Sequence, residues 1–357
     1  MKEQQPSLAM VGSIDEHIPQ RHPIRHLKIL ADRALASMND LFEGMYAHIG
    51  WPSVAPERLL KAQQLIALFS VRSDRQFCEQ LENDLLLRWF LDIVLDETAF
   101  DASTLFQNPE RLIRHRAGDE FLAAVICEAK SQHLLSKDHS SVDGTLIEAW
   151  ASLRSFRPKG EPLDDSNGWS DFRGEQRSDG THESRTDPEA RLGRKGKGLE
   201  AKLSYCGNIL MESRHGLIVD VDLAIVDGKA ERNGASRLLK RRGKRRARRT
   251  VAADKGFDPR AFVDACRELE FTPNLFRNQH GTHSSAIEGR TTGHRGYVIS
   301  MIVRRRIEQI FGWLKSCGGL RNTRFRGLLE VGLDAYLTAV AHNLLKLVRL
   351  ITAKAPA

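Results

Sequence analysis

The sequence predicts an α/β protein in which an all-helical N-terminal domain precedes a mixed sheet with flanking helices. Apolar residues recur at helical spacing over residues 26–135, whereas apolar and polar residues alternate in short segments of residues 136–350. The second half runs strand, strand, strand, helix, strand, helix, strand. That order predicts antiparallel strands followed by crossover units, which together make a mixed sheet covered by helices.

The N-terminal part shows helix start signals as well as periodicity. Residues 1–25 are polar and contain three prolines, and we expect them to form a flexible arm. Pro56 stands where the first residue of a helix would. Ser73, followed three residues later by Gln76, has the pattern of a capping box. These signals predict several short helices, which form the N-terminal domain over residues 26–135.

The second half begins with segments of strand character. The segment GLIVDVDLAIVDG alternates strictly, which places Asp220 and Asp222 on one face of a strand and predicts that they point to solvent. The short link before it predicts a hairpin with the preceding strand. The polar segment 155–198 is predicted to be a long loop within the domain at 136–350. Further strands are predicted within 140–150, 250–256 and 271–277.

The composition favours a polyanionic partner and excludes several classes of protein. The chain has 357 residues, of which 41% are hydrophobic and 28% charged, with a net charge of +8. A basic excess of this kind fits nucleic acid. The five cysteines form no C-x-x-C pair, which argues against a zinc site or a disulfide framework. No apolar run resembles a signal peptide or a membrane span, so we expect a cytoplasmic protein without a membrane partner.

Three carboxylates are candidates for a shared site. On a helical wheel, Arg304, Glu308 and Lys315 form a polar row along the rim of a buried stripe. Asp143 lies within a predicted strand and Asp254 at the C-terminal end of another, where sites gather in α/β sheets. Converging carboxylates repel one another unless a divalent cation neutralises them. Oxygen-only ligands suit Mg²⁺ or Mn²⁺, and two such ions are able to promote phosphoryl transfer.

Each of these residues also has a purely structural interpretation. Glu308 could form a surface pair with Arg304 four residues earlier. Asp254 could be a turn residue before Lys255 and Gly256, and Asp143 could begin a hairpin turn. Spacing alone leaves both interpretations open.

Basic residues are concentrated in two regions of the second half. The run RLLKRRGKRRARR, residues 237–249, has nine basic residues in thirteen, and it could be either a phosphate-binding patch or a solvated charge run. Three arginines follow the helix of Glu308. The predicted DNA-binding residues are Arg304, Lys315, Lys255, Arg321, Arg324, Arg326, Arg241, Arg242, Arg245 and Arg246.

Four segments resemble bacterial insertion-sequence transposases of the insertion-sequence-5 family. They are SVDGTLIEAWASLRSFRPK, DPEARLGRKGKGLEAKLSYCGNILMESRHGLIVD, ADKGFD and RRRIEQIFGWLKSCGGLRNTRFRG. The resemblance extends from about residue 15 to 350. It implies a ribonuclease H-like core in which Asp143, Asp254 and Glu308 are the catalytic DDE residues and ligate Mg²⁺, or Mn²⁺, as two ions.

The C-terminal signature of that family is Tyr, two residues, Arg, three residues, Glu, six residues, Lys. Arg304, Glu308 and Lys315 match it, but Met301 stands at the tyrosine position. This departure affects the contact that a tyrosine would make to DNA near the cut. Tyr297 lies one helical turn earlier and could substitute if the helix extends that far.

The resemblance implies a transposase that cleaves double-stranded DNA at terminal inverted repeats and transfers the ends into target DNA. We expect a homodimer or a larger assembly on DNA, with the N-terminal domain used either for binding DNA ends or for dimerisation. Two alternatives remain at this point. One is a DDE-like endonuclease without strand transfer, and the other is a transposase-derived DNA-binding protein without activity.

Overall fold

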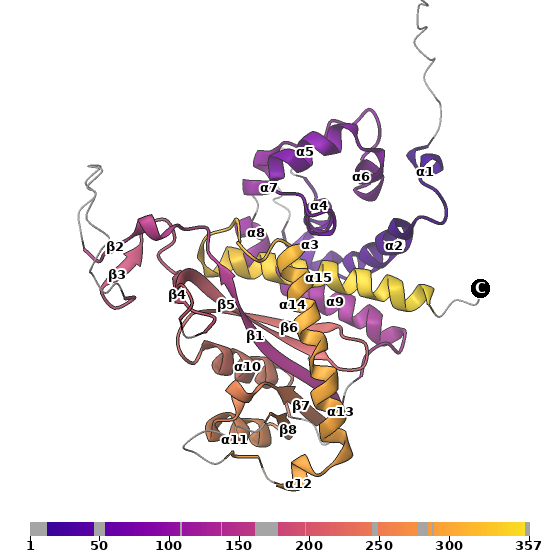
Figure 1. Cartoon of the computed structure of the whole chain (residues 1–357). Coiled ribbons are helices and arrows are strands. Elements are labelled where there is room, and N and C mark those ends of the chain that lie inside the picture. The colour runs from indigo at the N-terminus through magenta and orange to yellow at the C-terminus, as the bar shows by residue number, and fades with distance from the viewer. Residues whose placement is uncertain are drawn as a thin grey trace, which may run out of the picture.

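A computed structural model shows how these elements are arranged (Figure 1). The residues that the structure describes are 13–45, 54–107, 109–136, 138–160, 178–196, 198–244, 249–276, 285–287 and 289–353.

The N-terminal part is helical, as predicted from its periodicity and start signals. Pro56 is the first residue of α4, and the hydroxyl of Ser73 accepts a hydrogen bond from the backbone N–H of Gln76 at the start of α5. The helices are α1 (Ile14–His17), α2 (Pro23–Ala36), α3 (Asn39–Glu43), α4 (Pro56–Leu68), α5 (Asp74–Asn83), α6 (Leu85–Phe90), α7 (Ala102–Gln107), α8 (Pro109–Arg114) and α9 (Ala117–Ser131).

The expected flexible arm of residues 1–25 differs from the structure where the structure describes it. Residues 1–12 lie outside the described residues, but α1 and the start of α2 follow from Ser13 onwards. Asp15 accepts hydrogen bonds from Arg25 and from the indole of Trp89, at 2.8 Å each. Polarity and prolines suggested a loose segment, but Pro23 begins α2 and the carboxylate of Asp15 pairs with Arg25 and Trp89.

The second half contains a mixed sheet with the strand order β4-β5-β1-β7-β8, and β6 also pairs with β5. β1, β5 and β6 are antiparallel neighbours, whereas β7 and β8 run parallel to β1. Apart from the short β4, this is the strand arrangement of a ribonuclease H-like core. The strands are β1 (His139–Glu148), β4 (Arg191–Gly193), β5 (Lys202–Glu212), β6 (Ile218–Ile225), β7 (Arg249–Ala253) and β8 (Phe271–Leu275).

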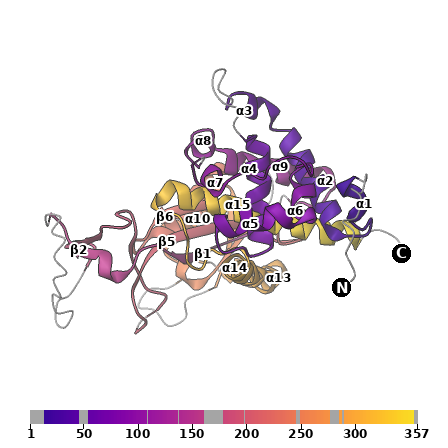
Figure 2. The ribbon, with the colours of Figure 1, turned by 90° about the horizontal axis from the view of Figure 1, so that it is seen from above.

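Helices cover both faces of the sheet (Figures 1 and 2). One face packs against α10 (Ala230–Arg241) and α11 (Arg260–Glu268), and the other packs against α14 (Arg306–Ser316) and α15 (Gly327–Thr352). Ile209 and Met211 of β5 belong to the core on the α15 side, whereas Leu210 between them belongs to the core under α10. The remaining helices are α12 (Gly289–Thr292) and α13 (Arg295–Arg304).

The helix α15 joins the N-terminal helices to the sheet. In Figure 1 it lies, in yellow, between the indigo and purple helices above and the strands below. One continuous hydrophobic core includes side chains of α2, α4, α9, α15 and β6. The N-terminal helices therefore form part of one packed unit with the sheet. Within the described part of the chain, no helix is both long and apolar enough to span a lipid bilayer.

The predicted loop at 155–198 contains short strands. β2 (Phe156–Pro158) pairs with β3 (His182–Ser184), and β4 lies within the same segment. The ring of Phe156 stacks on His182 with their centroids 5.4 Å apart. These strands have three residues each, too few to show a period of two in the sequence. Residues 161–177 lie outside the described residues.

The prediction that Asp220 and Asp222 point to solvent is wrong. Asp222 is buried and pairs with Arg237 at 2.7 Å, and Asp220 pairs with Arg241 at 3.0 Å. The phenol of Tyr336 also lies 3.4 Å from Asp220. Alternation predicts one wet face, but helices cover both faces of this sheet, so each aspartate needs a paired cation or donor.

Two helical glycines give a test of this packing. A Cβ atom at Gly234 of α10 would lie 2.1 Å from the Asn208 amide nitrogen and 2.9 Å from the Asp222 carboxylate, whereas nothing lies within 4 Å of one at Gly312 of α14. We expect Gly234→Ala to lower the free energy of unfolding by about 1–3 kcal/mol through overpacking. Gly312→Ala should raise it by up to about 1 kcal/mol, because alanine favours helix over glycine.

Urea denaturation of both variants and the wild type measures the two effects. Equal effects of the two substitutions would contradict the close approach of α10 to β5.

Candidate functional site

The parallel pairing of β1 with β7 places two of the predicted acidic residues side by side. Ser141 of β1 is in register with Ala252 of β7. Asp143 and Asp254 each follow their paired residue by two positions, so both stand at the same level of adjacent strands. The carboxylate of each accepts a hydrogen bond from the next backbone N–H, at 2.9 Å from Gly144 and 2.7 Å from Lys255.

The third predicted acid reaches the same place from a helix pair. The row of Arg304, Glu308 and Lys315 predicts one continuous helix, but the structure interrupts it at Arg305, between α13 and α14. At the interruption, the N–H of Glu308 bonds the carbonyl of Arg305, three residues back, which is the tighter 3₁₀ pattern. Ile307, Ile310 and Leu314 are buried as predicted. They fix α14, so that Glu308 lies on the exposed side of the helix.

The guanidinium of Arg304 lies among all three carboxylates. Its nitrogens are 3.7 Å from Asp143, 3.8 Å from Asp254 and 3.6 Å from Glu308. The Arg304 side chain is only 12% exposed, whereas Asp254 and Glu308 are 49% and 62% exposed. The structural interpretation of Glu308 as a partner of Arg304 is thus correct as geometry, but the pair is part of a larger cluster. Arg304 faces this cluster in the structure, and its contact to DNA stays a prediction.

The cluster shifts the protonation of its most buried member. Burial raises the pKa of Asp143 to about 6, against the opposing effects of the Gly144 N–H and Arg304. The negative charges of Glu231 and Asp254 add to the rise. Glu231 and Asp254 thus raise the pKa of Asp143, whereas Arg304 lowers it.

Glu231 is the residue that sequence reasoning missed. It lies in the first turn of α10, and its side chain approaches β1 so closely that a Cβ atom at Gly144 would be 2.7 Å from its Cγ. Burial, followed by the charge of Asp254, raises its own pKa. Its position depends on how α10 crosses the sheet, and no local sequence signal reports that.

The predicted DNA-binding residues differ in their surroundings. Several lie exposed on the surface: Lys255 directly after Asp254, Arg321 and Arg326 after α14, and Arg242 at the end of α10. Lys315 is half-buried, and burial together with the charge of Lys195 lowers its pKa to about 8. Arg245 and Arg246 lie outside the described residues.

Two further residues of that set are engaged in structural contacts. Arg241 pairs with Asp220 and with Asp222, 3.0 and 3.1 Å away. Arg324 pairs with Asp74 of α5 at 2.9 Å and so ties the segment after α14 to the N-terminal helices. Both were predicted to bind DNA because basic residues cluster in the sequence around them. The sequence does not show the acidic partners, which are distant along the chain.

The helix α13 extends as far as Tyr297. The hydroxyl of that residue donates a hydrogen bond to the carbonyl of Leu275 in β8 at 2.8 Å. This bond anchors α13 to the edge of the sheet. Met301, at the position of the signature tyrosine, lies half-buried on the same helix.

Comparisons with known protein families account for almost the whole described chain. Residues 12–111 match the family model described as Transposase domain (DUF772), and residues 137–344 match the model described as Transposase DDE domain. The second match spans more than half of the chain and contains all three predicted acidic residues. No curated protein matches this chain.

Two solved structures illustrate what the fold is similar to. A piggyBac transposase synaptic complex with hairpin DNA shares 8% identity, with 93% of this chain and 76% of that chain covered and a TM-score of 0.41. A pre-cleavage Mos1 transpososome shares 10% identity over 92% of this chain and 97% of that chain, with a TM-score of 0.20. At these scores the assignment rests on the family models. The chain belongs to the transposase DDE-domain family and is a transposase, an enzyme that cleaves and joins DNA.

Proposed function

We propose that Asp143, Asp254 and Glu308 are the catalytic residues of this transposase and that Arg304 positions them. The observation that carries the proposal is the approach of one guanidinium to all three carboxylates, at 3.6–3.8 Å. Asp143 on β1, Asp254 directly after β7 and Glu308 on α14 are distant along the chain and meet there. A surface ion pair would not require this convergence.

The same side chains supply the donors that a divalent cation needs. All three are carboxylates, and hard cations such as Mg²⁺ and Mn²⁺ take oxygen ligands. Among the described residues, no three acidic, histidine or cysteine side chains already form a ligand cluster, and the carboxylates face Arg304 instead. The donor chemistry therefore fits, provided that Arg304 gives way. Bound cations, two in this proposal, would supply charge neutralisation at the oxygens of the scissile phosphate.

The chain's own residues have separate tasks in this scheme. Asp143, the most buried acid, must be ionised to act as a ligand, and its raised pKa means that it loses its proton near pH 6. Arg304 lowers the repulsion among the acids and keeps them together. Glu231 adds negative charge beside Asp143 and would strengthen the attraction of this end of the sheet for cations.

The reaction proceeds in two phosphoryl transfers. In the first, water attacks a phosphodiester at the transposon end, the bond from phosphorus to the 3′ oxygen breaks, and that oxygen leaves as a 3′-hydroxyl. In the second, this hydroxyl attacks a target phosphodiester, and the target strand's 3′ oxygen is released with a proton. Neither step needs a covalent enzyme intermediate or ATP.

The DNA would lie over the exposed edge that holds the three acids. Lys255 follows Asp254 directly and is exposed, and Arg321 and Arg326 are exposed in the segment between α14 and α15, so cationic side chains lie next to Asp254 and beyond the C-terminal end of α14. Such donors position a phosphate backbone without reading its sequence. We place terminal inverted repeats and target DNA on this surface, with a homodimer or a larger assembly holding paired ends. The insertion-sequence-5 subfamily remains the assignment predicted from sequence.

Removing the Glu308 carboxylate should abolish chemistry without removing binding. We expect Glu308→Gln to lower Mg²⁺-dependent cleavage of a labelled fragment carrying the element's own ends by at least about a hundredfold, because a ligand is lost. Affinity for the same fragment in EDTA should stay within about twofold of wild type. The matched control is Glu268→Gln, an exposed glutamate of α11, which should cleave normally. Full cleavage by Glu308→Gln would overturn the proposed site.

Neutralising Asp143 should stabilise the fold at the cost of activity. Its pKa is raised from 3.8 to about 6 in the folded chain, so the folded state binds the proton more tightly than the unfolded state. Stability therefore falls as pH rises from about 4 to about 6, and the loss is complete above that window. About two pKa units correspond to at most about 3 kcal/mol. We expect Asp143→Asn to gain up to this amount at about pH 8 and little at about pH 4.

Urea denaturation in EDTA at the two pH values measures this difference. The control Asp96→Asn, at an exposed position, should change stability equally little at both. A destabilised Asp143→Asn at high pH would contradict the raised pKa, because it would mean that the ionised carboxylate stabilises the fold.

A further inference from the structure

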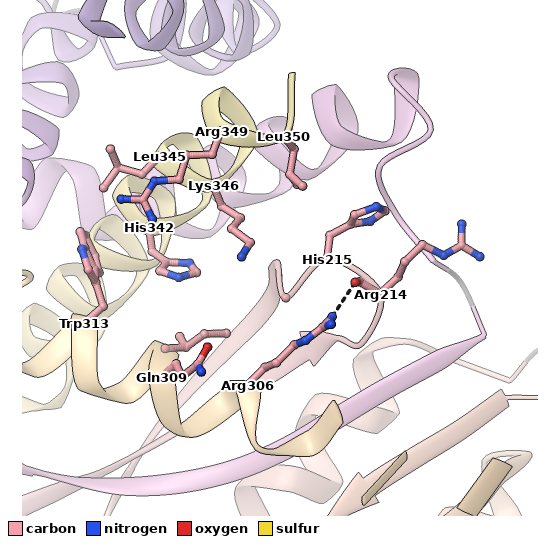
Figure 3. A pocket seen from close by; sticks show the side chains of 12 residues that line it. Arg214, His215, Arg306, Gln309, Trp313, His342, Leu345, Lys346, Arg349 and Leu350 are labelled. Carbon is pink, nitrogen blue, oxygen red and sulfur yellow. Dashed lines mark hydrogen bonds between the residues drawn. The ribbon is translucent and has the colours of Figure 1, made fainter. Parts of the chain in front are cut away.

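A second pocket lies on the other side of α14 from the carboxylates. It is enclosed by α14, α15 and the turn between β5 and β6, and its volume is about 460 Å³ (Figure 3). In the figure, His342 and Lys346 point from α15 toward α14, and Arg306 points from α14 toward the turn. Nothing in the predicted DDE site uses these residues.

The pocket is basic and has no acidic side chain among the described residues that line it. Four cations line it: Arg214, Arg306, Lys346 and Arg349. The carboxylate of Glu212 contacts two of the lining residues, Arg214 and His215. It is 1% exposed and accepts hydrogen bonds from the backbone N–H groups of Arg214 and His215. This carboxylate is therefore engaged by the turn, and none of the described residues that line the pocket supplies a negative charge to balance its cations.

Arg306 is held in position by the turn. One of its terminal nitrogens donates to the carbonyl of Ser213 at 3.1 Å and to that of Arg214 at 2.6 Å, the latter drawn in Figure 3. A guanidinium carries five N–H donors in a rigid fork, so other donors remain for a ligand. Gln309 and the indole of Trp313 line the same wall of α14 and add neutral polar and flat apolar surface.

The wall formed by α15 shows the electrostatic effect of this uncompensated charge. Burial and the guanidinium groups of Arg306 and Arg349 lower the pKa of Lys346. Burial lowers the pKa of His342 to about 4, so it is neutral at neutral pH and adds no charge. An anion bound in the pocket would lower the electrostatic repulsion among these cations. That decrease in repulsion would add to the free energy of anion binding.

The pocket and the carboxylates lie on nearly opposite sides of one helix. At about 100° per residue, Glu308 is about 200° around α14 from Arg306, whereas Gln309 and Trp313 lie within about 60° of it. The two sites are therefore separated by about one helix diameter, roughly 10–12 Å. A nucleic-acid strand advances about 3.4 Å per nucleotide along its axis, so a strand that passes around α14 from one site to the other spans at least about three phosphates.

We propose that this pocket binds the phosphodiester backbone of DNA a few nucleotides from the phosphate that is cut. The proposal rests on the proposed catalytic site, because that site fixes where the strand passes. Arginine forks and a lysine match phosphate oxygens, and contacts to phosphate position a strand without reading its sequence. The pocket would thus fix the register of the strand across α14.

The test compares the salt dependence of DNA binding between charge-matched variants. Lys346→Gln combined with Arg349→Gln removes two pocket cations and retains helix-forming residues in α15. The control is Arg260→Gln combined with Arg267→Gln, two exposed cations of α11, which packs on the other face of the sheet and outside the N-terminal helices. Binding of a labelled duplex carrying the element's ends is measured in EDTA between about 50 and 200 mM salt, so that no cleavage occurs.

We expect the pocket variant to reduce the slope of log affinity against log salt by nearly two, or about 0.9 per lost contact. The control should leave the slope unchanged. An unchanged slope in the pocket variant, or an equal loss in both variants, would overturn the proposal. A third outcome would also overturn the proposal. Inorganic phosphate could raise the melting temperature of the wild type but not of the pocket variant, while both proteins show the same salt dependence of DNA binding. The pocket would then bind a free phosphate ion and not the DNA backbone.

Failure of the catalytic proposal gives a different pattern. If Glu308→Gln cleaves normally while the pocket variant loses salt dependence, the catalytic assignment fails and the DNA contact remains.

Discussion

The parallel pairing of β1 with β7 is the constraint on which the rest of the site depends. It places Asp143 and Asp254 at the same level of neighbouring strands, two residues beyond a paired position. Two buried or half-buried acids so close would repel each other without a cation. Arg304 supplies that cation from the end of α13, and the break after it turns α14 so that Glu308 joins the cluster.

The carboxylates in this arrangement repel one another, and a bound cation would lower that repulsion. The pKa of Asp143 is raised because burial and two neighbouring acids outweigh its arginine partner. Sites of this kind sacrifice stability for function, since the groups that bind cations are the groups that repel one another. The basic pocket behind α14 carries the opposite charge. Its clustered cations repel one another, and a bound anion would lower that repulsion. The two sites would hold a phosphate backbone on both sides of one helix.

Much of the fold could be predicted from the sequence because its signals are local. Start signals marked α4 and α5, alternation marked β6, and the order of elements gave the mixed sheet. The positions of Asp143 within a strand and of Asp254 at the end of another were likewise predicted from the sequence. Their convergence with Glu308 was predicted only as a possibility from spacing, and the family resemblance made it definite.

What the sequence could not predict depends on contacts between distant segments. Asp222 was predicted to be exposed because the alternation of apolar and polar residues describes a single strand. It carries no information about the helix that covers that strand. The acidic partners of Arg241 and Arg324 could not be predicted because they lie far along the chain, and the DNA contacts of these two arginines stay predictions. Glu231 has no local signal at all, since its approach to β1 depends on the crossing of α10 over the sheet.

The most direct test of the shared site is a crystal of the protein grown with Mn²⁺ and examined for anomalous scattering. The proposal predicts at least one peak within ligand distance, about 2.0–2.5 Å, of carboxylate oxygens of Asp143 and Asp254, with Glu308 beside it and Arg304 moved away. Crystals of Glu308→Gln grown in the same way should show weaker occupancy. Three carboxylates still facing Arg304, with no manganese between them at saturating concentration, would contradict the account.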